Sequence, residues 1–172
     1  MDIILFTDGS STVFKDKKNM KYGGIGIYSP KIIKMSQGYT GNDITNQKME
    51  LQACIYGIKN VYNYMLNNHL GKLWNLVIYT DSMYVINSIT DYASKWILYG
   101  WKRKVNKKME IISNLELIKE LYILYRTLPI TFKHTNSHTK EPARDSIEWP
   151  IWKGNNKADK LAKNAMLKMR DE

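Results

Sequence analysis

Three short strand-like segments, joined by short turns, open this chain, and helical and strand-like segments alternate after them. The three segments lie at residues 2–7, 22–28 and 32–39, and the first has the pattern of a buried strand. Strands joined by short turns pair antiparallel, whereas a parallel neighbour needs a longer crossover, usually a helix. The order therefore predicts an α/β fold with a mixed sheet, in which parallel strands extend a three-stranded antiparallel meander.

The later elements are predicted from apolar periodicity and from helix caps. Helices are expected over 46–66, 82–89, 114–128 and 155–169, and Ser82 is well placed as the N-cap of the second of these. Two more strands are expected at 73–80 and 130–134. The run at 73–80 is nearly continuous in apolar residues, which is typical of a central strand. Together with the meander, these strands make a five-stranded sheet.

Two glycine-containing segments predict local features of the backbone. Asp8-Gly9-Ser10 is a turn signal that should close the first strand. Gly23 and Gly24 indicate a close backbone approach or a bulge, not a phosphate loop, because the sequence holds no GxxxxGK[ST] or GxGxxG pattern. Since the length fits one domain and no linker or repeat is visible, residues 1–172 are expected to form a single domain.

Charge and composition narrow the class of protein. Lys and Arg number 26 against 16 Asp and Glu, a net charge of +10, which points to a polyanionic partner, although a solvated basic surface is the common alternative. No apolar run approaches the ~20 residues that span a bilayer, and no basic leader precedes the first strand. We therefore expect no membrane association and an intracellular location, in cytoplasm, nucleus or a viral replication compartment. Cys54, the single cysteine, excludes a disulfide framework and is expected to be a buried thiol.

Four carboxylates stand at the edges of predicted elements. Asp8 and Asp81 each follow a buried strand, and two such groups on neighbouring strands repel unless a cation lies between them. Hard divalent cations such as Mg²⁺ prefer oxygen ligands. Glu50 and Asp159 lie early in predicted helices, where an acidic residue is also favoured by the helix dipole alone. A small acidic site on a basic protein suits metal-assisted phosphodiester chemistry.

Four segments in this order resemble the signature blocks of type 1 ribonuclease H: FTDGS, TNQKMEL, YTDSMYVINSIT and GNNKADKLA. GGIGIY, GYT and YASKWILYGWK also match, so the resemblance covers about residues 3–165. It implies the ribonuclease H-like fold, with helices on both faces of the sheet. It also implies an endoribonuclease that hydrolyses the RNA strand of RNA–DNA hybrids and leaves 5′-phosphate and 3′-hydroxyl ends. Two Mg²⁺ ions, with Mn²⁺ as an alternative, would be held by Asp8, Glu50, Asp81 and Asp159.

His138 resembles the loop histidine that the family uses in proton transfer and product release, although an ordinary loop residue is the alternative reading. The stretch between His138 and Asp159 is longer than is usual in the family. The extra residues, about 143–153, include Trp149 and Trp152. This insertion could cover the site, contact the substrate, or only lengthen a loop.

The resemblance assigns further residues to recognition of the RNA strand. Only RNA presents a 2′-hydroxyl in the wide minor groove, and side-chain amides can both donate to it and accept from it. The residues that match such positions are Asn46, Gln47 and Asn155. For Asn46 and Gln47 the ordinary alternative is helix N-terminal capping, which Thr45 or Asn46 could provide at the same time.

Other residues match positions that contact the DNA strand, through deoxyribose packing or a phosphate pocket. They are Thr45, Tyr92, Trp96 and Asn114. Without the resemblance, Trp96 and Trp101 would be assigned to the core. A basic protrusion near 92–110 would add salt-sensitive affinity for nucleic acid. Its cations are Lys95, Lys102, Arg103, Lys104, Lys107 and Lys108.

The expected protein is a monomeric catalytic domain that acts on RNA–DNA hybrids and has no separate hybrid-binding module before its first strand. Two alternatives stay open. One is a non-catalytic module that binds hybrids or duplexes, whose mark would be the loss of a carboxylate. The other is an integrase-like strand transferase or junction nuclease, and such proteins generally lack the TNQ block combined with the aromatic and basic segment.

Overall fold

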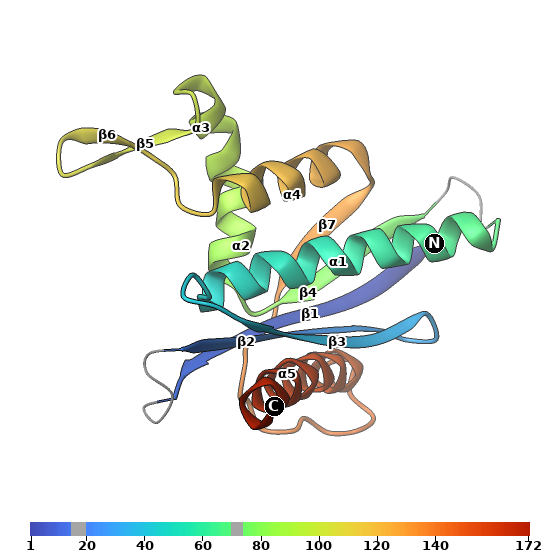
Figure 1. Ribbon diagram of the computed structural model, residues 1–172. Helices are drawn as coiled ribbons and strands as arrows, with labels where there is room; N and C mark the ends of the chain where they lie inside the picture. The colour runs from blue at the N-terminus through green and yellow to red at the C-terminus, as the bar shows by residue number, and fades with distance from the viewer. Residues whose placement is uncertain (15–19, 70–73) are drawn as a thin grey trace.

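A computed structural model describes residues 1–14, 20–69 and 74–172, and Figure 1 shows a central sheet between helices. The sheet has five strands in the order β3-β2-β1-β4-β7. β1 pairs antiparallel with β2, and β2 with β3, whereas β4 runs parallel to β1 and β7 parallel to β4. The strands are β1 (Asp2–Val13), β2 (Lys21–Ser29), β3 (Ile33–Thr40), β4 (Asn75–Thr80) and β7 (Ile130–His134). The predicted mixed sheet is therefore confirmed. Leu73, where the fourth strand was predicted to begin, lies outside the described residues.

Helices cover both faces of this sheet, as predicted (Figure 1). α1 contacts β1, β2 and α4 on one face, while α5 contacts β1, β2 and β3 on the other. A short π-helical turn, η1 (Ser88–Tyr92), joins α2 to α3. The helices are α1 (Asn46–Asn67), α2 (Met83–Asn87), α3 (Ala93–Leu98), α4 (Leu115–Thr127) and α5 (Trp149–Asp171). No helix among the described residues combines the length and the apolar character needed to cross a bilayer.

The alternation of side chains along β1 sends its residues to two different layers. Leu5 belongs to the apolar core beneath α1, and Thr7 contacts the thiol of Cys54 on α1 at 3.2 Å between Oγ1 and Sγ. Phe6 points the other way and packs against Gly154 of α5. Because successive side chains in a strand alternate, the residue after Thr7 also faces α5. Cys54 is fully buried, as predicted.

The basic protrusion contains a hairpin that the sequence analysis missed. β5 (Lys102–Val105) and β6 (Lys108–Ile111) form a two-stranded sheet of their own, which projects from the rest of the molecule (Figure 1). Asn106 and Lys107 connect them with φ values of 47° and 68°. Positive φ at both central residues is typical of a type I′ turn, which suits the twist of a two-residue hairpin. No glycine marks this turn, so the usual sequence signal is missing.

Two predicted boundaries are wrong. Asp8-Gly9-Ser10 is not a turn, because β1 continues to Val13 and stays paired with β2 as far as Lys21. The last helix begins at Trp149 instead of residue 155, with Pro150 in its first turn, where a missing N–H does no harm. Part of the insertion at 143–153 is therefore helical.

Glycines in β2 allow α5 to approach the sheet closely. A Cβ on Gly24 would lie 2.1 Å from the carbonyl oxygen of Ala162, and one on Gly26 would lie 2.0 Å from that of Ala158. The pairing of β1 with β2 runs through both positions without an extra residue. The close approach predicted at Gly24 is thus confirmed, and the bulge is not present in this strand pair.

We expect Gly26→Ala to destabilise the protein by about 1–3 kcal/mol or more, because the clashing atom belongs to the backbone of α5 and cannot rotate away. Gly57→Ala is the matched control: its Cβ would meet the tip of Leu5 at 3.0 Å, and alanine gains about 1 kcal/mol of helix propensity in α1. Urea unfolding of both variants measures the difference. Equal stabilities would contradict the packing argument.

Candidate active site

The end of β4 lies beside the middle of β1 and brings two predicted acidic residues side by side. Phe6 pairs with Tyr79 in the parallel register, and Asp8 and Asp81 each follow two residues later. Asp8 is buried, with 6% of its surface exposed, and faces α5. Asp81 lies just beyond the end of β4 and is half-buried.

Asp8 carries the strongest electrostatic perturbation in the site. Burial, the charges of Asp81 and Asp159, and a hydrogen bond with Asp159 raise its pKa to about 9. Asp159 reaches this position from α5, which packs closely on the glycines of β2. Asp81 and Asp159 therefore both lie near enough to Asp8 to repel its carboxylate.

Glu50 approaches the same group from α1. Burial raises the pKa of Glu50, and the charge of Asp81 raises it further, whereas a hydrogen bond from the Ser82 hydroxyl lowers it. The Asn46 amide also donates to Glu50 Oε1 at 2.8 Å. Ser82 also caps α2, as predicted, because its Oγ accepts a hydrogen bond from the N–H of Val85.

Helix-dipole preference does not account for the two helical carboxylates. Glu50 lies beyond the first turn of α1, and Asp159 lies well inside α5, which begins ten residues earlier at Trp149. The Asp159 side chain forms a hydrogen bond with Asp8, whereas the Glu50 side chain accepts from Ser82 and Asn46 and is affected by the charge of Asp81. The alternative reading of solvated first-turn residues is therefore wrong for both.

The chemistry of this donor set fits a hard divalent cation. Carboxylate oxygens are the ligands such ions prefer, and a cation would relieve the repulsion that raises the pKa of Asp8. Within the described part of the chain, no three acidic, histidine or cysteine side chains already form a metal-binding group. Protein donors hold the oxygens instead: Lys163 Nζ lies 3.0 Å from both oxygens of Asp159. A bound cation would share or replace these contacts.

His138 and Asp159 line one small cavity of about 70 Å³, together with Asn155 and Trp152. The loop of His138 leaves the sheet at Thr135, whose N–H donates to the carbonyl oxygen of Thr80 at 3.0 Å. His138 itself is exposed and has a φ of 54°. The predicted histidine, one predicted amide and one predicted carboxylate therefore come together.

Thr45 and Asn114 both stand at helix N-termini. Thr45 caps α1, because its Oγ1 accepts from the N–H of Lys48 at 3.1 Å. The cap of α1 is therefore Thr45, while the Asn46 amide donates to Glu50. Gln47, the remaining RNA-strand candidate of this helix, is exposed.

Asn114 adopts φ of 56° before α4, and its amide donates to the hydroxyl of Tyr84 at 3.1 Å instead of capping the helix.

The aromatic residues of the protrusion differ in exposure. Tyr92 is exposed and Trp96 half-buried, with their ring centroids 5.6 Å apart. Trp101 packs on Tyr122 at 6.3 Å and contributes to the edge of the core. The core assignment thus holds for Trp101 and in part for Trp96. The protrusion cations are all exposed: Lys95, Lys102, Arg103, Lys104, Lys107 and Lys108.

The sequence analysis missed three contributors to these surfaces. Ser82 was recognised only as a helix cap and not as a donor to Glu50. Lys163 lies one helical turn after Asp159, a spacing that signals a side-chain contact on a helix and could have identified it. Tyr99 lines a cavity of about 370 Å³ on the protrusion beside Trp96, and no sequence signal distinguished it from other surface tyrosines.

Comparison with known proteins identifies relatives across nearly the whole chain. The sequence model of the RNase H family matches residues 1–167. A probable ribonuclease H of Acanthamoeba polyphaga mimivirus is 34% identical over 145 residues, which cover 83% of this chain and 58% of that protein. This chain therefore spans just over half the length of that relative. A ribonuclease H of Wolbachia pipientis wMel is 31% identical over 172 residues, which cover 96% of each protein.

A solved structure shows the same fold. The solution structure of the PFV RNase H domain superposes with a TM-score of 0.68 at 24% identity, covering 96% of this chain and 94% of that one. Identity at this level supports the arrangement of helices and strands and carries no argument about individual side chains.

We expect Asp8→Asn to stabilise the protein in EDTA at pH 8 but not at pH 4. The folded-state pKa is raised from 3.8 to about 9, so between these values the folded protein holds a proton that the unfolded chain has lost. Stability then falls as pH rises through this window, and the neutral amide avoids the loss. A gain of at least about 1.4 kcal/mol at pH 8, equivalent to one pKa unit, is expected.

Thermal melts across this pH range test the expectation. Asp2→Asn, an exposed residue at the other end of β1, serves as the control. An equal gain at pH 4 and pH 8 would show that repulsion around Asp8 is not its cause.

Proposed function

This chain belongs to the RNase H family, and from that membership we propose that it is a ribonuclease H that hydrolyses the RNA strand of RNA–DNA hybrids. The observation that carries the proposal is the convergence of the four family blocks on one point. Asp8 from the first block is buried against Asp81 and Asp159, and Asp81 also raises the pKa of Glu50. A binding module has no need to bury mutually repelling acids, whereas a metal-dependent nuclease does.

Two divalent cations, Mg²⁺ or Mn²⁺, would be held by these four carboxylates and, when bound, would supply an activated water and stabilise the leaving oxygen. Hydrolysis of this kind adds water across the P–O3′ bond, so the RNA fragments carry 5′-phosphate and 3′-hydroxyl ends. Ser82 and Asn46 orient the carboxylate of Glu50 by donating to its two oxygens. His138, which shares a cavity with Asp159, would exchange a proton through its imidazole as product leaves.

Recognition of the RNA strand is proposed for Asn46, Gln47 and Asn155. Asn46 donates directly to Glu50, so an amide that contacts a 2′-hydroxyl would lie beside the reacting phosphate. Asn155 is buried and lines the cavity that contains His138 and Asp159. The amides therefore flank the carboxylate group from α1 and from α5.

Recognition of the DNA strand is proposed for the exposed Tyr92, for Trp96 and for two helix N-termini. Thr45 accepts the N–H of Lys48 and keeps its hydroxyl proton for a phosphate oxygen. At α4, the Asn114 side chain bonds to Tyr84, which leaves the first N–H groups of the helix available to an anion. We further propose that residues 1–172 act as a monomeric catalytic domain, with the hairpin as its basic protrusion.

A strand-labelled duplex tests the proposed activity. The RNA–DNA hybrid, RNA–RNA and DNA–DNA are each incubated with Mg²⁺ and with EDTA, and products from each strand are resolved. We expect cuts in the RNA strand of the hybrid alone, abolished by EDTA, with 5′-phosphate ends. Tight hybrid binding without any cut would contradict the enzyme and support a binding module, while cuts in duplex DNA would favour a junction-nuclease activity.

Asp81→Asn should abolish detectable cleavage, because it removes a charged ligand and leaves a side chain of the same size. The melting temperature in EDTA should not fall, since one of the repelling charges is lost. Asp2→Asn should cleave at the rate of the unmodified protein. Near-normal turnover by a folded Asp81→Asn variant would refute the assignment of this carboxylate.

Replacing Arg103 and Lys104 with glutamine should weaken hybrid binding and lower the slope of log K against log salt by about one for each phosphate that is no longer neutralised. Both lie on the exposed strand β5, away from the carboxylates. Lys34→Gln, an exposed cation on β3, is the control. An unchanged salt slope, measured by titration from low to moderate salt, would remove the hairpin from the binding surface.

A further inference from the structure

The insertion at 143–153 places two tryptophans on one side of the first turns of α5. Trp149 and Trp152 are three residues apart, a spacing that puts side chains on the same helix face. Both indoles donate hydrogen bonds to the preceding loop. Trp152 Nε1 donates to the carbonyl oxygen of Thr139 at 3.1 Å, and Trp149 Nε1 donates to Glu141 Oε1 at 2.9 Å.

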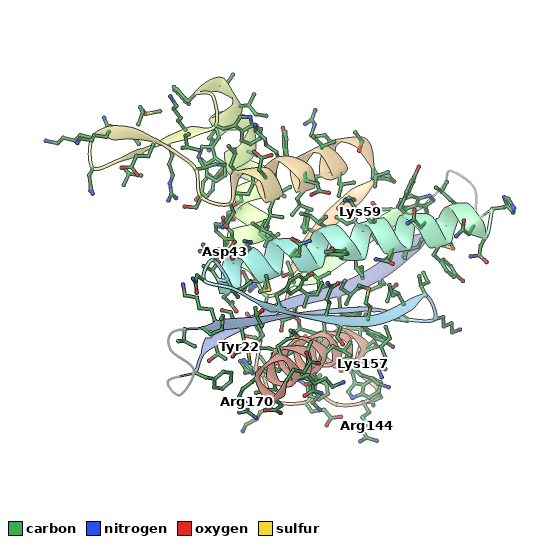
Figure 2. The ribbon with its side chains drawn as sticks, in the orientation of Figure 1. Tyr22, Asp43, Lys59, Arg144, Lys157 and Arg170 are labelled. Carbon is green, nitrogen blue, oxygen red and sulfur yellow. The ribbon has the colours of Figure 1, made fainter. Side chains whose placement is uncertain are left out.

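These two bonds differ in what they hold. The Trp152 bond ends on the backbone of the residue that directly follows His138, whereas the Trp149 bond ends on a side chain. Glu141 also pairs with Arg144, which lies on the outer side of the loop beneath α5 (Figure 2). Lys153 Nζ lies 4.5 Å above the Trp149 ring. The contacts around Trp149 therefore belong to the surface, whereas the Trp152 hydrogen bond belongs to the loop that carries His138.

His138 lies between two attachment points of this loop. Before it, Thr135 donates its N–H to the carbonyl oxygen of Thr80, at the end of β4. After it, the carbonyl oxygen of Thr139 accepts the indole N–H of Trp152. The left-handed backbone of His138, with φ of 54°, is unfavourable for a residue other than glycine and persists only where neighbouring contacts enforce it.

The Trp152 side chain is also a wall of the cavity that His138 and Asp159 share. One residue thus sets the backbone next to the histidine and bounds the space in front of it. Tryptophan suits this task because its indole N–H can donate a hydrogen bond but cannot accept one, so its partner here must be an acceptor such as a carbonyl oxygen.

We propose that Trp152 is a positioning residue for His138, and that the insertion braces the histidine loop against the carboxylate group. The inference rests on the proposed ribonuclease H function for its consequence in catalysis. Its structural content, an ordered loop held by one indole, does not depend on that function. The insertion then neither covers the site nor only lengthens a loop.

The activity test compares Trp152→Phe with His138→Ala and with the double variant. Trp152→Phe keeps an aromatic ring and loses the donor, so kcat should fall about tenfold, as expected for a misplaced catalytic group, with KM changed less than about twofold. His138→Ala should lower kcat roughly 100-fold or more. If Trp152 acts through His138, adding Trp152→Phe to His138→Ala should cause no further loss, and the limb of the pH–rate profile that His138→Ala removes should shift in Trp152→Phe alone.

Trp149→Phe is the matched control, since it removes an indole from the same helix face but spares the backbone next to His138. It should leave kcat within about twofold of the unmodified protein, well short of the loss expected from a misplaced catalytic group. Independent, multiplicative losses from Trp152→Phe and His138→Ala would overturn the proposal. So would equal effects of Trp152→Phe and Trp149→Phe.

A measurement without substrate separates this proposal from the proposed function. Amide ¹⁵N relaxation of the unmodified protein should give order parameters near 0.85 for residues 137–141, and Trp152→Phe should lower them below about 0.6. Values below about 0.6 in the unmodified protein would overturn the brace even if a variant failed to fold. An ordered loop in a protein that cuts no hybrid would refute the proposed function and leave the brace intact.

Discussion

The candidate site depends on how closely two helices approach the sheet, and glycine permits that approach at both contacts. A Cβ on Gly9 would lie 2.3 Å from the backbone nitrogen of Glu50, and one on Gly26 would lie 2.0 Å from the carbonyl oxygen of Ala158. Gly9 follows Asp8, and Ala158 precedes Asp159. Each helix is therefore in backbone contact with the sheet at the position where its carboxylate is needed. Larger side chains at these glycines would separate the acids.

That proximity has an electrostatic consequence for the fold. Asp8 is buried beside Asp81 and Asp159, and its pKa rises to about 9, so at neutral pH the metal-free protein keeps a proton on Asp8 that the unfolded chain has lost, at a cost in stability. Packing of the apolar core beneath α1 and of α5 on the sheet has to offset this cost. Such a conflict between stability and local charge is typical of functional sites. Hydrogen bonds from Ser82, Asn46 and Lys163 reduce it and at the same time hold the carboxylate oxygens in defined positions.

The acidic group and the cations of the hairpin lie apart in this protein. The acidic group lies where β4 ends beside the middle of β1, whereas a set of exposed cations lies on the β5–β6 hairpin, which projects from the body of the molecule (Figure 1). The hairpin cations can therefore attract a polyanion without pairing with the carboxylates of the site. Trp152 of the insertion links a third element, the loop of His138, to α5.

Local signals in the sequence were sufficient for most elements and for the Ser82 cap, because periodicity and capping act over a few residues. Short motifs also pointed to four carboxylates that the fold brings near one another. Local signals failed where a neighbouring element decides the outcome. β1 runs through Asp8-Gly9-Ser10 because β2 pairs with it there, and the hairpin forms around Asn106 and Lys107 without a turn glycine. The raised pKa of Asp8 depends on Asp81 and Asp159, which are distant from it in the sequence. The hydrogen bond from Trp152 to Thr139 connects residues that are separated by a loop. Charge repulsion, burial and hydrogen bonds depend on distance in space, so only the tertiary structure could decide them.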